Sequence, residues 1–78
     1  MLPELPDVFG EVLRKHRKRK GWSQMKLATE AGLHLNALSN LERGKRNPSL
    51  HTVFVLARAL GVPPSKLVAA VEKIDPKI

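Results

Sequence analysis

The chain has no cysteine and no tyrosine, and its 78 residues include only one tryptophan and two phenylalanines. The lack of cysteine excludes thiol catalysis, cysteine-type zinc sites and disulfide bonds, and it suits a reducing environment. The few aromatic residues, Phe9, Trp22 and Phe54, are not interleaved with the basic residues. This separation argues against a platform on which single-stranded nucleic acid could stack.

The sequence also lacks a long apolar run and the features of a signal peptide. Its start, "MLPELPDVFG", carries acids and prolines where a signal peptide has a basic region followed by an apolar one. No apolar stretch is long enough to span a membrane. We therefore expect a cytoplasmic protein with no membrane partner, in which residues 1–78 form a single domain with its core at about 7–74.

Residues that would support catalysis are scarce. The histidines His16, His34 and His51 fall on different predicted helices or caps, and no acidic pair lies near them to orient them. Their spacing does not match a helical HExxH metal site. We therefore predict no enzyme activity, no metal or other cofactor, and no small-molecule ligand.

Positive charge, in contrast, is in excess. Fourteen Lys and Arg residues face seven Asp and Glu residues, which gives a formal net charge of +7. Six of the fourteen lie in "RKHRKRK", residues 14–20, and Arg43, Lys45 and Arg46 flank Gly44. This distribution predicts a polyanionic partner, although a solvated helix face that keeps the protein in solution would explain the first run equally well.

Glycine and proline punctuate the chain where helices are expected to end. Asp7 is the expected N-cap of a first helix that runs to Gly21, with Gly10 in its first turn, where glycine harms least. Ser23 and Ser49 are the expected caps of later helices. Apolar periodicity predicts these later helices at residues 24–31, 35–42 and 50–60 and from Pro63–Pro64 to about 74. The predicted fold class is therefore all-α, a compact bundle of five short helices.

The segment "FGEVLRKHRKRKGWSQMKLATEAGLHLNALSNLERGKRNPSLHTVFVLARALGV" resembles the phage-repressor and Cro-like helix-turn-helix family, also called the XRE family. Motifs that agree in spacing carry the resemblance: "SQ" opening the second helix, "LA..AG" before the turn, "L..LE.G" in the third helix and "R.PSL.T...LA.ALGV" after it. The size and the segment "ERGKRNPSL" also resemble the controller proteins of restriction-modification systems. The resemblance implies a lambda-repressor-like bundle with a helix-turn-helix formed by residues 24–31 and 35–42.

The resemblance further implies that residues 35–42 form the recognition helix in the major groove, while residues 24–31 cross the phosphate backbone. At ~100° per residue, Leu38 and Leu41 fall on one side of the recognition helix, and a polar face lies opposite. Asparagine can pair with adenine; Leu35 can meet a thymine methyl group or pack inward beside Leu38 instead. The predicted base-contacting residues are Leu35, Asn36, Ser39 and Asn40, although the polar residues among them could also be only solvated.

Predicted phosphate contacts surround this helix. Gln24 takes the phosphate role of the family at the first position after the Ser23 cap, where free N–H groups attract anions. Lys26 replaces the usual acidic residue, and His34 replaces the usual Ser or Thr cap. Each of these two either faces DNA or is a tolerated surface substitution. The predicted phosphate-contacting set is Gln24, Lys26, His34, Arg43, Lys45 and Arg46.

Arg17 and Glu42 lie on otherwise apolar faces of their helices. Similar members of the family pair these positions in a salt bridge between the first and third helices. The resemblance therefore assigns both residues to the framework that holds the recognition helix, and Glu42 is not taken as a catalytic acid.

The resemblance implies a prokaryotic or phage transcriptional regulator, such as a repressor, that binds double-stranded DNA sequence-specifically as a homodimer on a palindromic operator. In the last helix, Val68, Val71 and Ile74 are candidates for the dimer interface, unless they close the core of the monomer instead. RNA polymerase is a candidate second partner. The alternative function is an antitoxin or another protein-binding module of the same fold, which would need a large apolar patch or an extra segment.

Overall fold

The computed structural model describes residues 4–74, and within this range the chain forms five helices and no strand. The helices are α1 (Leu5–Arg19), α2 (Gln24–Ala31), α3 (Leu35–Glu42), α4 (Leu50–Leu60) and α5 (Pro64–Ile74). The all-α prediction is confirmed. The bounds predicted for the last four helices agree closely with those observed, since Ser23 and Ser49 cap α2 and α4 as expected.

The first helix begins earlier than predicted. It starts at Leu5, with Glu4 as the N-cap and Pro6 in the first turn. Asp7, which was expected to be the cap, instead lies inside the helix, where its carboxylate accepts a hydrogen bond from the backbone N–H of Glu4 at 3.2 Å. The Asp7 carboxylate therefore binds the backbone N–H of the N-cap residue from within the first turn of the helix.

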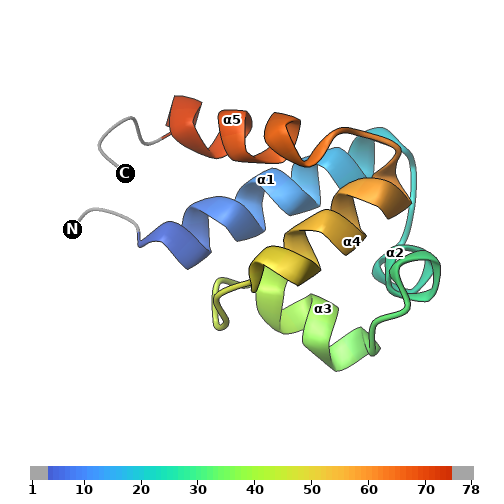
Figure 1. Ribbon diagram of the computed structural model, residues 1–78. Helices are drawn as coiled ribbons and strands as arrows, with labels where there is room; N and C mark the ends of the chain where they lie inside the picture. The colour runs from blue at the N-terminus through green and yellow to red at the C-terminus, as the bar shows by residue number, and fades with distance from the viewer. Residues whose placement is uncertain (1–3, 75–78) are drawn as a thin grey trace.

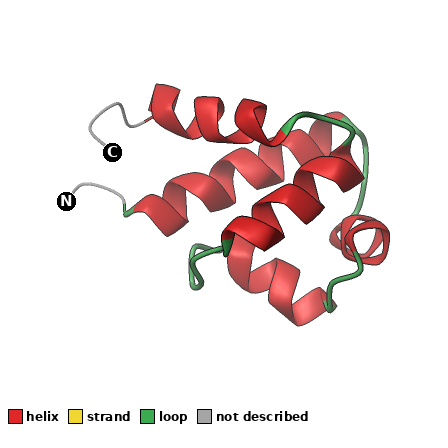
Figure 2. Ribbon diagram, in the orientation of Figure 1, coloured by secondary structure: helices red, strands yellow, loops and turns green. Residues whose placement is uncertain are grey.

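Each helix contributes to one shared core. α1 packs against both α3 and α5, α2 packs against α3 and α4, and α4 packs against α5. Figure 1 shows α5 along one side of α1 and α3 on the opposite side, and Figure 2 shows the short loops that join the helices. The centre holds one fully buried leucine from every helix: Leu13, Leu27, Leu38, Leu56 and Leu67.

Within residues 4–74, no single helix is long and apolar enough to cross a membrane. The helices α4 and α5 together have the length and apolar composition of a membrane span, but this pair is bent by 106°. Both of them supply buried residues to the core.

Gly10 lies where α1 crosses the end of α3, and the expectation that it occupies an undemanding first-turn position is corrected. Because α1 begins at Leu5, Gly10 is in the second turn and is buried. A Cβ atom at this position would lie 2.5 Å from the carbonyl oxygen of Glu42 and 2.6 Å from that of Leu41. Glycine is therefore required because the backbones of α1 and α3 approach so closely.

Gly44 sets the path of the loop that follows α3. Its φ is +73°, a left-handed conformation that favours glycine, and a Cβ atom there would collide with Asp7 of α1. The loop residues Lys45 and Arg46 come directly after this turn. The position of the cationic loop is thus fixed against the start of α1.

Replacing Gly10 with alanine should destabilise the protein, although alanine is the better helix former by ~1 kcal/mol. The added methyl group must push α3 away from α1, so we expect urea denaturation to show a loss of about 1–3 kcal/mol in the free energy of unfolding. Thr29→Ala, on the exposed surface of α2, is a control in which improved helix propensity should slightly raise stability. An unchanged or higher stability of Gly10→Ala would contradict the close approach.

Candidate nucleic-acid interface

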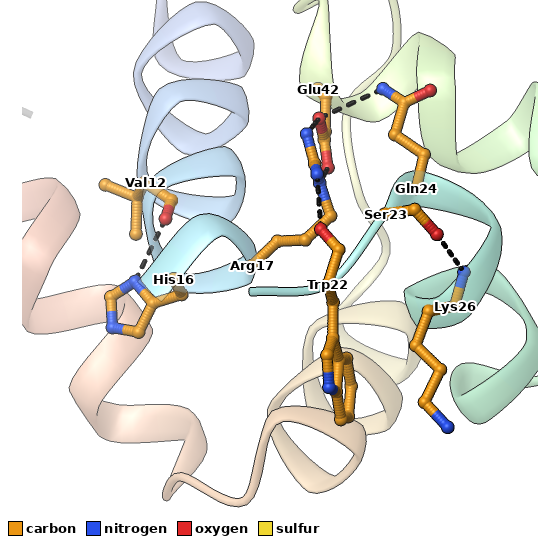
Figure 3. Close-up of polar contacts among 8 residues, drawn as sticks. All are labelled: Val12, His16, Arg17, Trp22, Ser23, Gln24, Lys26 and Glu42. Carbon is orange, nitrogen blue, oxygen red and sulfur yellow. Dashed lines mark hydrogen bonds and ion pairs between the residues drawn. The ribbon is translucent and has the colours of Figure 1, made fainter. Parts of the chain in front are cut away.

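A buried ion pair fixes the C-terminal end of α3 to α1. Arg17 Nε donates to Glu42 Oε2 at 2.7 Å, and Arg17 Nη2 donates to Glu42 Oε1 at 3.0 Å (Figure 3). Only 8% of Arg17 and 5% of Glu42 is exposed. Arg17 Nη1 also donates to the carbonyl oxygen of Trp22 at 2.7 Å. The structure therefore places the two residues of the expected framework pair in direct two-point contact.

The same carboxylate also reaches α2. Gln24 Nε2 donates to Glu42 Oε1 at 3.0 Å (Figure 3). Gln24 is the first residue of α2 and follows Ser23, whose Oγ accepts from the backbone N–H of Lys26 at 3.1 Å. Glu42 thus links α1, α2 and α3, and it holds the Gln24 amide beside the N–H groups of the first turn of α2, which have no partner within the helix.

Lys26 has partners within the protein. Its Nζ lies 3.4 Å from Glu30 Oε1 and 5.5 Å from the centroid of the Trp22 ring. Figure 3 shows its side chain pointing away from Glu42, whereas that of Gln24 runs toward Glu42. An acid and an aromatic ring therefore offset the unfavourable place of this lysine near the positive end of a helix dipole, and a phosphate is not needed to explain it.

The recognition helix predicted from the sequence turns its polar face outward. Leu38 and Leu41 are buried, while Asn36 is exposed and Leu35 is 39% exposed. Of the two alternatives for Leu35, this exposure supports the outward one. The buried leucines seat α3 on the core, and residues 35–37 of its first turn are left at the surface.

Ser39 and Asn40 lie at the edges of this face and are half-buried. Asn40 Oδ1 accepts a hydrogen bond from Arg43 Nη2 at 3.0 Å. The acceptor of the Asn40 amide is therefore engaged within the protein, so a paired contact with adenine would require Arg43 to release it.

A groove of about 600 Å³ runs between α3 and the start of α4. It brings together His34, Asn36, Asn40 and Arg46, which the sequence had placed in separate sets of base and phosphate contacts. His34 is the exposed N-cap of α3, and its side chain makes no capping hydrogen bond. Ser39 and Lys45 lie outside this groove.

Several residues that line the groove were not predicted as contacts, among them Ala37, Asn47 and Thr52. Ala37 is exposed beside Asn36, so the helical period alone could have indicated it. Asn47 lies in the loop and Thr52 in the first turn of α4, and only the path of the chain after α3 brings them to the groove. The sequence carries no signal for that proximity.

The loop after α3 forms a cationic edge to this face. Arg43, Lys45 and Arg46 are all exposed, and segment 43–49 contains no acidic residue. The backbone N–H of Lys45 donates to the carbonyl oxygen of Asn40 at 2.9 Å, which ties the loop to the end of α3. Positive charge is therefore held next to the polar face of the helix. Among residues 4–74, no group of three or more His, Cys, Asp or Glu side chains could hold a metal ion.

The three residues predicted for a dimer interface lie along two grooves in the structure. Val71 is 6% exposed and belongs to the core, which supports the alternative that it closes the monomer, although it also lines the same groove as Val68. Val68 is 50% exposed and lines a groove of about 480 Å³ together with Leu5 and Leu50. Ile74 is 41% exposed and lines a different groove, between α1 and α5.

Known proteins match this chain over most of its length. A sequence model described as helix-turn-helix matches residues 13–67. Control protein C.BamHI of Bacillus amyloliquefaciens is 44% identical over 61 residues, which cover 77% of this chain and 75% of that protein. The restriction-modification controller protein C.AhdI of Aeromonas hydrophila superposes with a TM-score of 0.77 at 42% identity, covering 80% of this chain and 94% of that one.

A further solved structure is described with DNA. It is the restriction-modification controller protein C.Esp1396I, a tetramer in complex with its natural 35 base-pair operator. It superposes with a TM-score of 0.83 at 25% identity, covering 92% of this chain and 95% of that one.

Removing the Glu42 carboxylate should destabilise the protein strongly, because Arg17 would remain as a buried charge without its partner. For Glu42→Ala we expect the free energy of unfolding, measured by urea denaturation, to fall by about 3–5 kcal/mol. Glu11→Ala is the matched control, since its carboxylate lies 3.3 Å from Lys15 Nζ in an exposed pair. This control should lose less than about 1 kcal/mol. Equal losses in the two variants would refute the framework role of Glu42.

Proposed function

Since the chain belongs to the helix-turn-helix family of prokaryotic and phage transcriptional regulators, we propose that it binds double-stranded DNA sequence-specifically and reads the major groove with α3. The observation that carries this proposal is the placement of α3. Its polar face is exposed beside a cationic loop, while its C-terminal Glu42 is anchored to α1 and α2. The major groove of B-DNA, ~12 Å wide, admits a helix presented in this way.

Base contacts come from the outward side of α3. The exposed amide of Asn36 offers a donor and an acceptor together, and Leu35 offers an apolar surface to a thymine methyl group. Ser39 and Asn40 are half-buried and contact bases at the edge of the helix. Asn40 acts there through its amide N–H groups as long as Arg43 occupies its oxygen.

Phosphate contacts flank α3 on two sides. On one side is the start of α2, where the Gln24 amide has a second N–H to donate beside the free backbone N–H groups. On the other side are the exposed loop cations, Lys45 and Arg46, with His34 at the start of α3. Lys26 is exposed and can reach phosphate, but its part in phosphate binding is small because its Nζ is already near Glu30.

A second copy of the chain covers the apolar groove of Leu5, Leu50 and Val68 in the proposed assembly. Leu50 is 73% exposed and is the first residue of α4, directly after the loop that flanks α3. In this assembly the two-fold axis runs perpendicular to the DNA, because half-sites ~34 Å apart require both α3 helices on the same face. The tetrameric state described for C.Esp1396I on its operator supports an oligomer on DNA.

Lys45→Ala should lower the salt dependence of DNA binding, because one phosphate contact is lost. The slope of log K against log salt should fall by ~1, measured by fluorescence anisotropy with a labelled random-sequence duplex. Lys66→Ala, on the exposed surface of α5, removes the same charge away from α3 and should leave the slope unchanged. A wild-type slope in Lys45→Ala, or the same reduction in both variants, would contradict the assignment of the loop to phosphate.

A further inference from the structure

A second cationic surface lies between α1 and α5, outside the candidate DNA interface. A groove of about 340 Å³ is bordered by Lys15 and Arg19 from α1 and by Lys66 and Lys73 from α5. The described lining of the groove contains no acidic residue. Within residues 4–74, Arg19 and Lys66 make no ion pair, and Lys15 has one acidic neighbour, Glu11. Among residues 4–74, the groove therefore concentrates positive charge, of which only Lys15 has an acidic partner.

The floor of this groove is apolar. It includes Val12, Ala70 and Ile74, and Ile74 is 41% exposed. Four cations around an apolar floor form an amphipathic surface. A ligand that fits it needs both negative charge and apolar side chains.

His16, beneath the groove, has an unsatisfied nitrogen. Its Nδ1 lies 2.9 Å from the carbonyl oxygen of Val12, and because a carbonyl only accepts, Nδ1 must be the donor. His16 is 9% exposed, and its Nε2 is buried with no partner among the described residues. Figure 3 shows the ring on the side of α1 that faces the neighbouring helix, with Nε2 away from Val12. Buried polar atoms are nearly always paired, so the unpaired Nε2 leaves the floor of the groove with an unsatisfied hydrogen-bond acceptor.

The groove is not part of the surface that would contact a duplex bound to α3. α1 lies between α3 and α5 (Figure 1), and Arg17, which bonds to α3, is two positions from both Lys15 and Arg19. Two positions turn ~200° around a helix, so the groove opens on the far side of α1. A sugar–phosphate backbone also has no side chain to cover an apolar floor.

We propose that the groove between α1 and α5 docks an acidic amphipathic segment of a partner protein. Its carboxylates pair with the four basic side chains, and its apolar side chains cover Ile74 and the floor. Lys66 and Lys73 are seven residues apart on α5, a rise of ~10.5 Å, so the groove accommodates about two turns of a helix. This surface is separate from the DNA interface, and the proposal stands whether or not α3 reads bases.

The test measures fluorescence anisotropy of two labelled synthetic peptides on the full chain. Both are helical heptad repeats with leucine along one face; one carries glutamate beside the leucines, and the other carries glutamine. The glutamate peptide should bind at least tenfold more tightly than the glutamine peptide. The double variant Arg19→Glu, Lys66→Glu should weaken glutamate-peptide binding at least tenfold, and Ile74→Gln should weaken it at least threefold.

The matched control is the double variant Arg14→Glu, Lys18→Glu, which changes the net charge equally. Both residues are exposed on α1 and lie outside the groove, so binding should change less than threefold. Circular dichroism establishes that every variant is folded. The proposal is overturned if the wild type does not bind the glutamate peptide, or if both double variants weaken peptide binding equally. It is also overturned if Ile74→Gln has no effect on peptide binding while the double variant Arg19→Glu, Lys66→Glu loses affinity for duplex DNA. The last result would make the groove a nucleic-acid site.

Discussion

Three helices meet at one buried carboxylate, that of Glu42. It accepts hydrogen bonds from Arg17 of α1 and from Gln24 of α2, and it is itself the last residue of α3. A buried pair of this kind adds little to stability relative to apolar packing, but it is costly to separate once formed. Its effect is therefore geometric, because the three helices must keep the one arrangement in which these charged groups are satisfied. That arrangement presents the polar face of α3 to the exterior.

The close backbone contacts reinforce the same constraint. Gly10 lets α1 touch the carbonyl groups at the end of α3, and Gly44 lets the following loop turn against Asp7. Both glycines act at the C-terminal end of α3, as does Glu42. The two ends of the candidate DNA interface, the start of α2 and the cationic loop, are in this way held at fixed positions relative to α3.

Much of this fold was predictable because its signals are local. Serine caps and terminal glycines gave the bounds of α2 to α4, and helical periodicity separated the buried from the exposed face of α3. The rest depends on which helices become neighbours. Periodicity could not decide that Val71 packs inward while Val68 stays exposed, or that Asn47 and Thr52 join α3 in a groove. It also could not show that Gly10 is a contact point, because the partner atoms come from a helix some thirty residues later.

The central claim is that two copies of α3, held in this way, read a symmetric DNA site. Selection of bound duplexes from a random pool tests it most directly, with wild-type protein and Val68→Glu compared after both are shown to be folded. Wild type should enrich a two-fold symmetric sequence with half-sites about one helical turn, ~10 base pairs, apart, and Val68→Glu should lose this symmetry. No enriched sequence with wild-type protein would contradict the account and favour a protein-binding function. The same symmetric site from both proteins would place the dimer contact elsewhere.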